Sequence, residues 1–213
     1  MRTLNAVLAA TARELERVGF EGLTVDGITA SAGLAHGTFY RYFRSRSDAA
    51  VAVLRLYAAA VRHLRPRGGR LAAFDAIHRM NEFYVASYSA NAALLAAREQ
   101  IVQQRPDRAI ARDRLNHRWS ILVLRDLSVR RGMVSSALGT AFDHSLVRSA
   151  IAMADELLRE RYVHQSTTLA TLLPNDEETA LLLSFAWYRL LYGCDPQATP
   201  EKVKLRLLAR DAS

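Results

Sequence analysis

Apolar residues recur every three or four positions along most of the chain, which is the spacing of one face of an α-helix. Glycine and proline are sparse and stand where these periodic segments end, and no convincing run alternates with period two as a strand would. The pattern therefore predicts an all-α fold of about nine helices. The predicted helices cover about residues 3–18, 25–32, 36–42, 45–64, 70–88, 91–104, 106–131, 140–163 and 176–193, with a polar connection at 164–174 and a short terminal helix at 201–209.

Local signals fix the ends of the first helices. Gly19 can take the left-handed conformation that ends a helix, and Phe20 behind it can fold back on Leu15. Thr24 is an N-cap residue type directly before the second periodic segment, and Gly33 stops that segment. The N-terminal part is thus predicted to hold short helices joined by tight turns.

The two short helices on either side of Gly33 suggest a helix-turn-helix, whose first helix lies across the DNA backbone while the second enters the major groove. The turn favours glycine because its conformation is costly for residues with a Cβ atom. Gly37 is a poor helix former, at a cost of about 1 kcal/mol relative to Ala, so its position early in the second helix makes sense if DNA must approach closely. The tyrosines and arginines that follow are suitable donors to phosphate oxygens.

Composition adds a charge argument. The formal net charge is +8, which makes an acidic partner such as DNA plausible. No apolar run approaches the roughly 20 residues that span a bilayer, and the N-terminal pattern has no signal-peptide core. The single cysteine, Cys194, gives neither an intramolecular disulfide nor a metal-ligand set. A cytoplasmic protein without a membrane segment is the prediction.

The segment from Leu23 to Arg46 resembles the signature of the TetR (tetracycline-repressor) family. In that family a Thr opens the second helix, an Ala-Gly turn follows, and then Gly-Thr-Phe-Tyr-x-Tyr-Phe and a basic residue lead into the fourth helix. The resemblance implies a helix-turn-helix domain at 1–46 and a helical ligand-binding and dimerisation domain at 47–213. It also implies a homodimer that binds a palindromic double-stranded DNA operator, acts as a repressor by default, and is released by a small effector.

The resemblance also implies roles for single residues. Thr24 and Arg46 match positions that touch phosphate, and His36 stands where relatives vary and contact bases. Two departures from the pattern are Gly27, in place of a helix former, and Ala35, in place of the frequent Ser or Thr. The candidate DNA contacts are Thr24, His36, Gly37, Thr38, Tyr40, Arg41, Tyr42, Arg44 and Arg46.

Blander roles stay open for some of these residues. Tyr40 can be half-buried packing, Arg41 and Arg44 can form a solvated face, and His36 can be a cap or merely exposed. Phe39 and Phe43 are expected in the core.

The C-terminal part offers a candidate pocket and a candidate interface. Aromatic and apolar residues of the middle helices suggest a hydrophobic effector, although ordinary core packing is the commoner role of such residues, and Arg98, Asn116 and His117 are possible polar contacts. The candidate pocket residues are Phe74, Met80, Phe83, Tyr84, Tyr88, Trp119 and Leu122. Helices 140–163 and 176–193 have wider apolar faces than one covered side needs, which indicates a subunit interface. The candidate interface residues are Phe142, Leu146, Ile151, Leu158, Leu183, Trp187, Leu190 and Leu191.

Two other classes of protein are weighed against a regulator. A metal-dependent helical enzyme could use the pairs Asp113 with His117 or His78 with Glu82, but surface salt pairs share this spacing, and no phosphate loop or nucleophile motif accompanies them. A helical adaptor that lost DNA binding is disfavoured by the basic charge and the retained motif. The prediction is a non-enzymatic protein with no cofactor and no metal.

Overall fold

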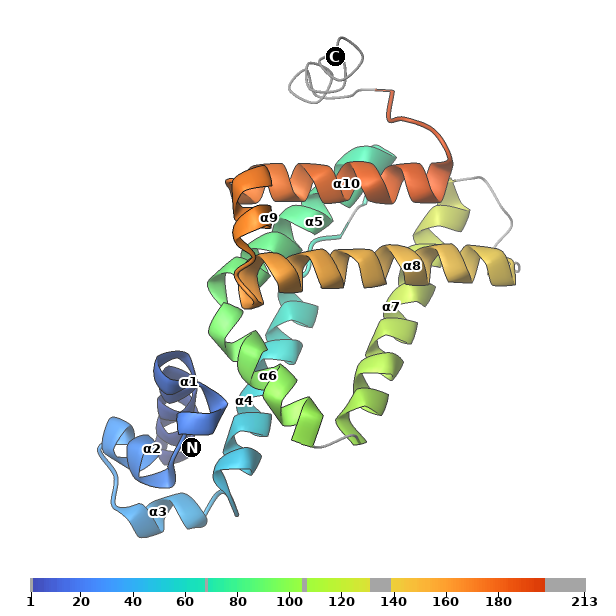
Figure 1. Ribbon diagram of the computed structural model, residues 1–213. Coiled ribbons are helices and arrows are strands. Elements are labelled where there is room, and N and C mark those ends of the chain that lie inside the picture. The colour runs from blue at the N-terminus through green and yellow to red at the C-terminus, as the bar shows by residue number, and fades with distance from the viewer. Residues whose placement is uncertain (1, 68, 105–106, 131–138, 198–213) are drawn as a thin grey trace.

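The computed structural model (Figure 1) describes residues 2–67, 69–104, 107–130 and 139–197. For residue 104 and residues 107–115 it describes the backbone only. Within these ranges it consists of helices and turns, without a strand, and it confirms the all-α prediction. The helices are α1 (Arg2–Gly22), α2 (Val25–Ala32), α3 (His36–Tyr40), α4 (Arg46–Leu64), α5 (Ala73–Ala90), α6 (Ala92–Gln104), α7 (Asp107–Arg130), α8 (Ala141–Leu158), the π-helix η1 (Arg159–Val163), α9 (Thr167–Leu172) and α10 (Asp176–Tyr192).

The N-terminal helices share one hydrophobic core. Leu15, Ile28 and Phe39 are fully buried there, which joins α1, α2 and α3. The first half of α4 contributes Ala49 and Ala50, so this core extends beyond residue 46. Helix α6 also packs into it, through Leu94, Ala97 and Ile101. Because α4 and α6 run on into the upper part of the molecule, they connect the two parts (Figure 1).

The predicted end of the first helix is confirmed in part. Gly19 has φ 69° and ψ −176°, so the backbone kinks there, and a last helical turn continues to Gly22. Phe20 and Leu15 lie in the same core cluster, as predicted. The kink turns the end of α1 toward α2, and Thr24 then opens α2.

The C-terminal helices form a second packed unit. Helix α10 packs along α5 and also contacts α8, while α7 packs against α8 (Figure 1). Leu124, Val147 and Trp187 are buried where α7, α8 and α10 meet. Leu158 and Leu183 are buried with Val85 of α5 in a neighbouring cluster. The wide apolar faces of α8 and α10 are therefore used largely within one chain.

The region after α8 differs from the prediction. The helix predicted to run to 163 changes to π-helical hydrogen bonding over η1, and Gln165 then has a positive φ of 55°. The predicted polar connection 164–174 contains α9, which Ser166 caps by accepting from the Leu169 N–H at 3.4 Å. Six residues are too few for hydrophobic periodicity to reveal, which is why this helix was not predicted. The predicted terminal helix 201–209 lies outside the described residues.

In the part of the chain that the structure describes, none of the helices has both the length and the apolar character needed to cross a bilayer.

Candidate nucleic-acid interface

The turn between α2 and α3 is fixed by backbone hydrogen bonds. Thr24 Oγ1 accepts from the Gly27 N–H at 3.0 Å and so caps α2 as predicted. Gly33 is left-handed, with φ 64° and ψ 37°, and its N–H donates to Ala30 O while the Leu34 N–H donates to Thr29 O. Only glycine adopts this conformation without a steric cost, so the Gly33 turn sets the direction in which α3 leaves α2.

Gly27 lies at a crowded point next to this cap. A Cβ atom there would stand 3.1 Å from Thr24 Oγ1 and 3.3 Å from Glu14 Oε2. Glu14 is buried and receives a 2.5 Å hydrogen bond from Arg17, which lowers the pKa of its carboxyl. The departure from the family pattern at Gly27 is thus explained by the space that the cap and this carboxylate occupy.

Helix α3 has one buried face and one exposed face. Phe39 is fully buried and lies 5.8 Å from the Phe43 ring, which anchors the helix on the N-terminal core. Both phenylalanines are core residues, as predicted. The opposite side and the turn after α3 carry candidate contacts that are all exposed: His36, Gly37, Tyr40, Arg41, Tyr42 and Arg44. Thr24 is exposed as well, and Thr38 is half-buried.

His36 is held in a defined orientation. Its Nδ1 lies 2.5 Å from Asp26 Oδ1, and its ring lies 5.4 Å from the Tyr40 ring. The contact with the carboxylate leaves Nε2 as the remaining polar atom of the ring, and the His36 side chain is half exposed. A fixed imidazole at the start of α3 is suited to contact a base edge.

Neither the backbone conformation nor the packing around Gly37 requires a glycine at this position. A Cβ atom built on it meets no other atom within 4 Å, and its φ is not in the positive range. The space that a methyl group would fill is therefore open on the exposed side of α3. This is the arrangement expected where another molecule approaches the backbone closely.

Tyr42 and Arg41 border an open groove of about 450 Å³ between α1 and α4. Leu4 and Leu8 of α1 and Leu56 of α4 also line this groove. The Tyr42 side chain is 38% exposed, so it lies on the rim and is not buried. Tyr40 is 54% exposed, which disfavours the packing role left open for it.

Arg46 has a different environment from the one implied by the resemblance. Its Nη1 donates to the carbonyl oxygens of Glu21, at 2.9 Å, and of Phe20 and Leu23. The guanidinium also lies over the Phe20 ring, 5.4 Å from its centroid. Arg46 thus fastens the start of α4 to the carbonyl end of α1, where a cation is favourable. A phosphate contact would have to use its remaining N–H groups.

The predicted pocket residues have different surroundings in the structure, and their role in binding an effector stays a prediction. Phe74 is buried in ring contacts with Phe185 and Tyr188, and the Tyr88 hydroxyl donates to Asp155 Oδ1 at 3.2 Å. Met80 and Phe83 are half-buried, and Leu122 is 43% exposed.

Tyr84 and Trp119 are in ring contact with each other at 5.7 Å. Arg65 lies 3.9 Å above the Trp119 ring, and burial raises the pKa of the Tyr84 phenol. Both residues are half-buried and pack against side chains of their own chain, and their place in a ligand pocket stays a prediction.

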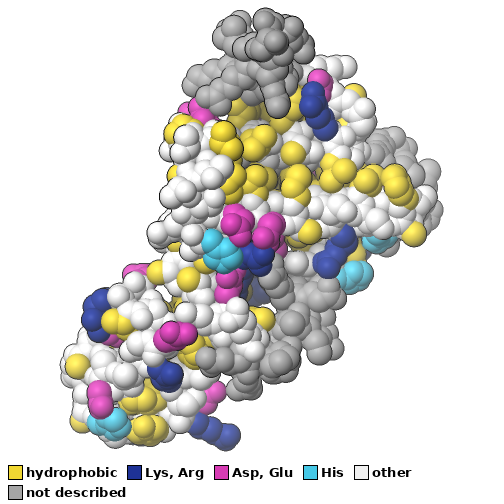
Figure 2. All heavy atoms as spheres, in the orientation of Figure 1, with side chains coloured by type: hydrophobic (Ala, Val, Ile, Leu, Met, Phe, Trp, Pro, Cys, Tyr) yellow, Lys and Arg dark blue, Asp and Glu magenta, His cyan; other side chains and the backbone are white. Residues whose placement is uncertain are grey.

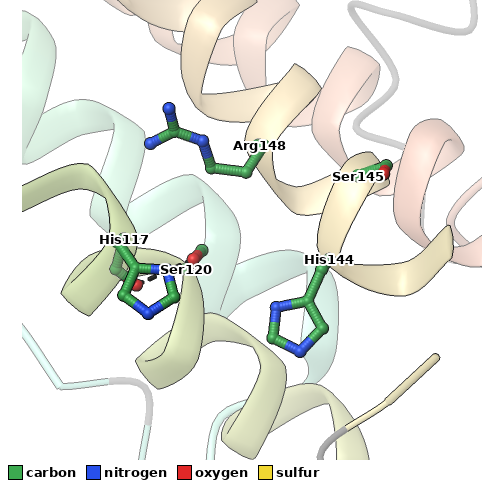
Figure 3. Close-up of a pocket in the computed structure, with 5 residues that line it drawn as sticks. All are labelled: His117, Ser120, His144, Ser145 and Arg148. Atoms are coloured by element: carbon green, nitrogen blue, oxygen red, sulfur yellow. Dashed lines mark hydrogen bonds between the residues drawn. The ribbon is translucent and has the colours of Figure 1, made fainter. Parts of the chain in front are cut away.

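A cleft in the C-terminal part instead lies between α7 and α8. It measures about 380 Å³ and is lined by His117, Ser120, His144, Ser145 and Arg148 (Figure 3). Of these residues only His117 was predicted as a possible polar contact. The signal for the others was present as spacing, because His144 and Arg148 are four apart on α8 and His117 and Ser120 are three apart on α7.

The predicted interface residues divide into two groups. Five of them are buried within the single chain, at 8% exposure or less, and so do not form a surface: Ile151, Leu158, Leu183, Trp187 and Leu191. Phe142 is 69% exposed, and Leu146 and Leu190 are half-buried. Leu182, which was not singled out, is 45% exposed on α10. Figure 2 shows hydrophobic side chains gathered over α8 and α10 on the face in view.

The helical pairs considered for a metal lie in different surroundings. His78 Nε2 is 3.6 Å from Glu82 Oε1, while its Nδ1 lies 3.1 Å from Ser184 Oγ and its ring stacks on Phe74. The Asp113 side chain lies outside the described residues. Among the side chains that the structure describes, no three histidine, cysteine or acidic groups come together as metal ligands.

Comparisons with known proteins agree with this geometry. Residues 7–53 match the family model described as bacterial regulatory proteins, tetR family. A tetR-family transcriptional regulator from Streptomyces coelicolor has a similar structure, with a TM-score of 0.69, 18% sequence identity, and coverage of 100% of this chain and 98% of the other.

A second solved structure, the fatty acid degradation regulator FadR from Bacillus halodurans, has a TM-score of 0.54 at 17% identity, over 91% of this chain and 96% of the other. No curated protein matches the chain in sequence. The likeness to the two structures shows a shared fold over nearly the whole chain.

Proposed function

We propose that this chain, whose residues 7–53 match the model of the tetR family of bacterial regulatory proteins, is a homodimeric repressor of that family. In this proposal it binds a palindromic DNA operator through α3 and leaves it when a small effector binds the C-terminal part. The match of residues 7–53 to the family model supports DNA-binding transcription regulation.

One observation carries the proposal. Helix α3 buries Phe39 and exposes His36, Gly37, Tyr40 and Tyr42 on its other side and the turn beyond it. A helix with this division can lie in the major groove while its buried face holds it to the domain. Hydroxyl and guanidinium groups of the exposed side are donors to phosphate, and His36 is the candidate for base contact.

A dimer is proposed because one α3 reads only half of a palindrome. Two recognition helices about 34–36 Å apart fit successive major grooves on one face of the duplex. Phe142 and Leu182 give α8 and α10 exposed apolar side chains, with Leu146 and Leu190 half-buried beside them. We assign the subunit interface to this surface.

Selection of binding sites from fragmented genomic DNA of the source organism tests the regulator proposal. At physiological salt the purified chain should enrich a palindromic site, and light scattering should give the mass of a dimer. Binding that stays weak, unselective and strongly dependent on salt would favour the adaptor that lost specific DNA binding.

The variant Tyr42→Phe tests the proposed phosphate contact. Loss of a hydroxyl hydrogen bond to a charged phosphate should cost about 1–2 kcal/mol, so affinity should fall about five- to thirtyfold. The fall should be similar on selected and random DNA, because phosphates carry no sequence information. His36→Ala should instead change the selected sequence. Tyr188→Phe, on α10, is the matched control and should bind DNA like the wild type.

A further inference from the structure

The open groove between α1 and α4 combines an apolar lining with basic side chains. Five of the eight residues that line its volume of about 450 Å³ are apolar: Leu4, Leu8, Phe43, Ala52 and Leu56. The other three are Arg41, Tyr42 and Arg55, and none of the eight is acidic. We propose that this groove binds an amphiphilic anion, an apolar chain or ring that carries a carboxylate or a phosphate, and that this anion and DNA exclude each other.

The polar groups of the groove are available to a ligand. Within the described part of the chain, the guanidinium groups of Arg41 and Arg55 and the hydroxyl of Tyr42 form no hydrogen bond or ion pair. Both arginines are exposed, and Tyr42 is 38% exposed. Two guanidinium groups and one hydroxyl can therefore donate to an anion, and the planar fork of a guanidinium matches the oxygens of a carboxylate or a phosphate.

No acidic side chain of the lining helices offsets this positive charge. The turn of α1 that lines the groove, residues 4–8, contains no charged residue. Asp48 is the only acidic residue of α4, and it stands in the first turn, where the helix dipole favours a carboxylate. It is not among the residues that line the groove. The charge of the groove is thus that of its two arginines.

The apolar residues favour a ligand with a hydrocarbon part. Leu56 is 54% exposed, and Leu4, Leu8 and Phe43 are half-buried, so apolar surface is left on the groove. An apolar chain that covers these side chains is stabilised because their surface is removed from water. The chemistry of the lining therefore selects a molecule that is apolar at one end and anionic at the other.

The size of the groove favours a small molecule over a protein partner. Its volume lies within the range of roughly 300–1,000 Å³ for small-molecule sites. Residues 4–8 of α1 and 52–56 of α4 each provide only about one helical turn of lining. A partner helix of several turns would extend beyond this groove at both ends.

The groove shares two residues with the proposed DNA contacts. Arg41 and Tyr42 line it, and both are candidate donors to DNA phosphates. An anion that accepts from these donors takes the place of a DNA phosphate, so it lowers DNA affinity by direct competition. This differs from an effector in the C-terminal part, which must act through the helices between the two parts. The exclusion of DNA rests on the proposed regulator function, while the binding of the anion does not.

The test is isothermal titration calorimetry on the full-length protein. The probes are octanoate and octyl phosphate, with octanamide as the neutral counterpart and acetate as the anion without a chain. Wild type is compared with Arg55→Gln and Leu56→Gln, which change two exposed residues of the groove. The matched controls Arg62→Gln and Leu64→Gln change exposed residues of α4 outside the groove. The unfolding temperature of each variant is measured, and either groove variant suffices if the other does not fold.

At least one of the two anions should bind wild type about fivefold or more tightly than octanamide, because a charge-assisted hydrogen bond is stronger than a neutral one. Octanoate should bind more tightly than acetate, since its chain covers the leucines. Arg55→Gln and Leu56→Gln should each weaken the binding about five- to tenfold, and the two controls should not. The tighter of the two anions identifies the anionic group that the groove prefers.

The competition with DNA is measured by fluorescence anisotropy. The bound anion should weaken selected and random DNA alike, because the shared donors contact phosphate and not bases. Arg55 is not a proposed DNA contact, so Arg55→Gln without the anion should bind DNA like the wild type. The same variant should need about five- to tenfold more anion to release DNA.

No binding of either anion, or equal binding in Arg55→Gln, Leu56→Gln and wild type, overturns the groove site, and equal binding would place the ligand elsewhere in the chain. A bound anion that leaves DNA affinity unchanged overturns the competition. If the protein selects an operator but binds no anion, the groove proposal alone fails. If it binds the anion in the groove but selects no DNA, the regulator function fails and the anion site stands.

Discussion

Replacing Gly37 with Ala tests whether glycine is needed at this position for folding or for DNA binding. A Cβ atom at this position meets nothing within 4 Å, and Ala is favoured over Gly in a helix by about 1 kcal/mol. The variant should therefore be at least as stable as wild type in urea unfolding, and up to about 1 kcal/mol more stable. The structure gives no intramolecular reason for a loss.

DNA affinity should change in the opposite direction. If α3 lies in the major groove and its backbone contacts DNA at Gly37, the added methyl group must push α3 away from the DNA. Such overpacking costs about 1–3 kcal/mol. Affinity on the selected operator, measured by fluorescence anisotropy, should fall about 5- to 150-fold. Unchanged affinity in a stable Gly37→Ala variant would refute the argument that the open space serves DNA.

Gly33→Ala provides the contrasting control. Gly33 has a φ of 64°, where a side chain costs about 1–2 kcal/mol. This variant should lose stability first, with DNA binding reduced as a consequence. The two variants thus distinguish Gly33, which the turn needs, from Gly37, which the proposed DNA contact needs.

Two further predictions concern the links between elements. Arg46→Gln removes the guanidinium from three carbonyl oxygens at the end of α1 and should cost about 1–3 kcal/mol in urea unfolding; full stability with reduced DNA affinity would show that its main role is phosphate contact. Hydrogen bonds to Glu160 and Glu99 raise the pKa of His164. Its stabilising contribution is therefore complete below the unfolded-state pKa of about 6.5 and is lost as pH rises through the folded-state pKa. In His164→Gln, the unfolding free energy should fall less steeply above pH of about 6.5 than in wild type. The control variant His63→Gln, at an exposed position of α4, should keep the wild-type pH profile. An unchanged pH profile in His164→Gln would contradict the stabilising role given to His164.

The N-terminal part was predictable because its signals are local. Thr24 and Gly33 act on backbone groups within a few residues, and the sequence pattern is sufficient to assign the cap and the turn. Arg46 could not be predicted in the same way, since its partners lie more than 20 residues earlier in the chain. A resemblance gives the usual role of a position, while the contacts of this arginine depend on how α1 ends.

The C-terminal part shows why apolar faces alone are ambiguous. Burial in a protomer and burial between subunits require the same residue types, so Trp187 and Leu183 resembled interface residues until the packing of α10 on α5 and α8 was known. The cleft was missed for a related reason. His144 and Arg148 form a polar face on a helix whose apolar face dominates the sequence pattern, and His117 comes from a different helix.

Helix α6 links the two parts of the molecule physically, as the proposed regulation requires. It buries Leu94 and Ile101 in the core of the DNA-binding part, while Glu99 on the same helix is held by Arg159 and His164 after α8. Figure 2 shows acidic, basic and histidine side chains gathered where the lower and upper parts of the molecule meet. Buried side chains of α6 cannot slide without repacking the core around them. A displacement of α8 must therefore either break the ion pairs at Glu99 or move α6 together with α1. If α6 and α1 move, the distance between the two α3 helices of the proposed dimer changes.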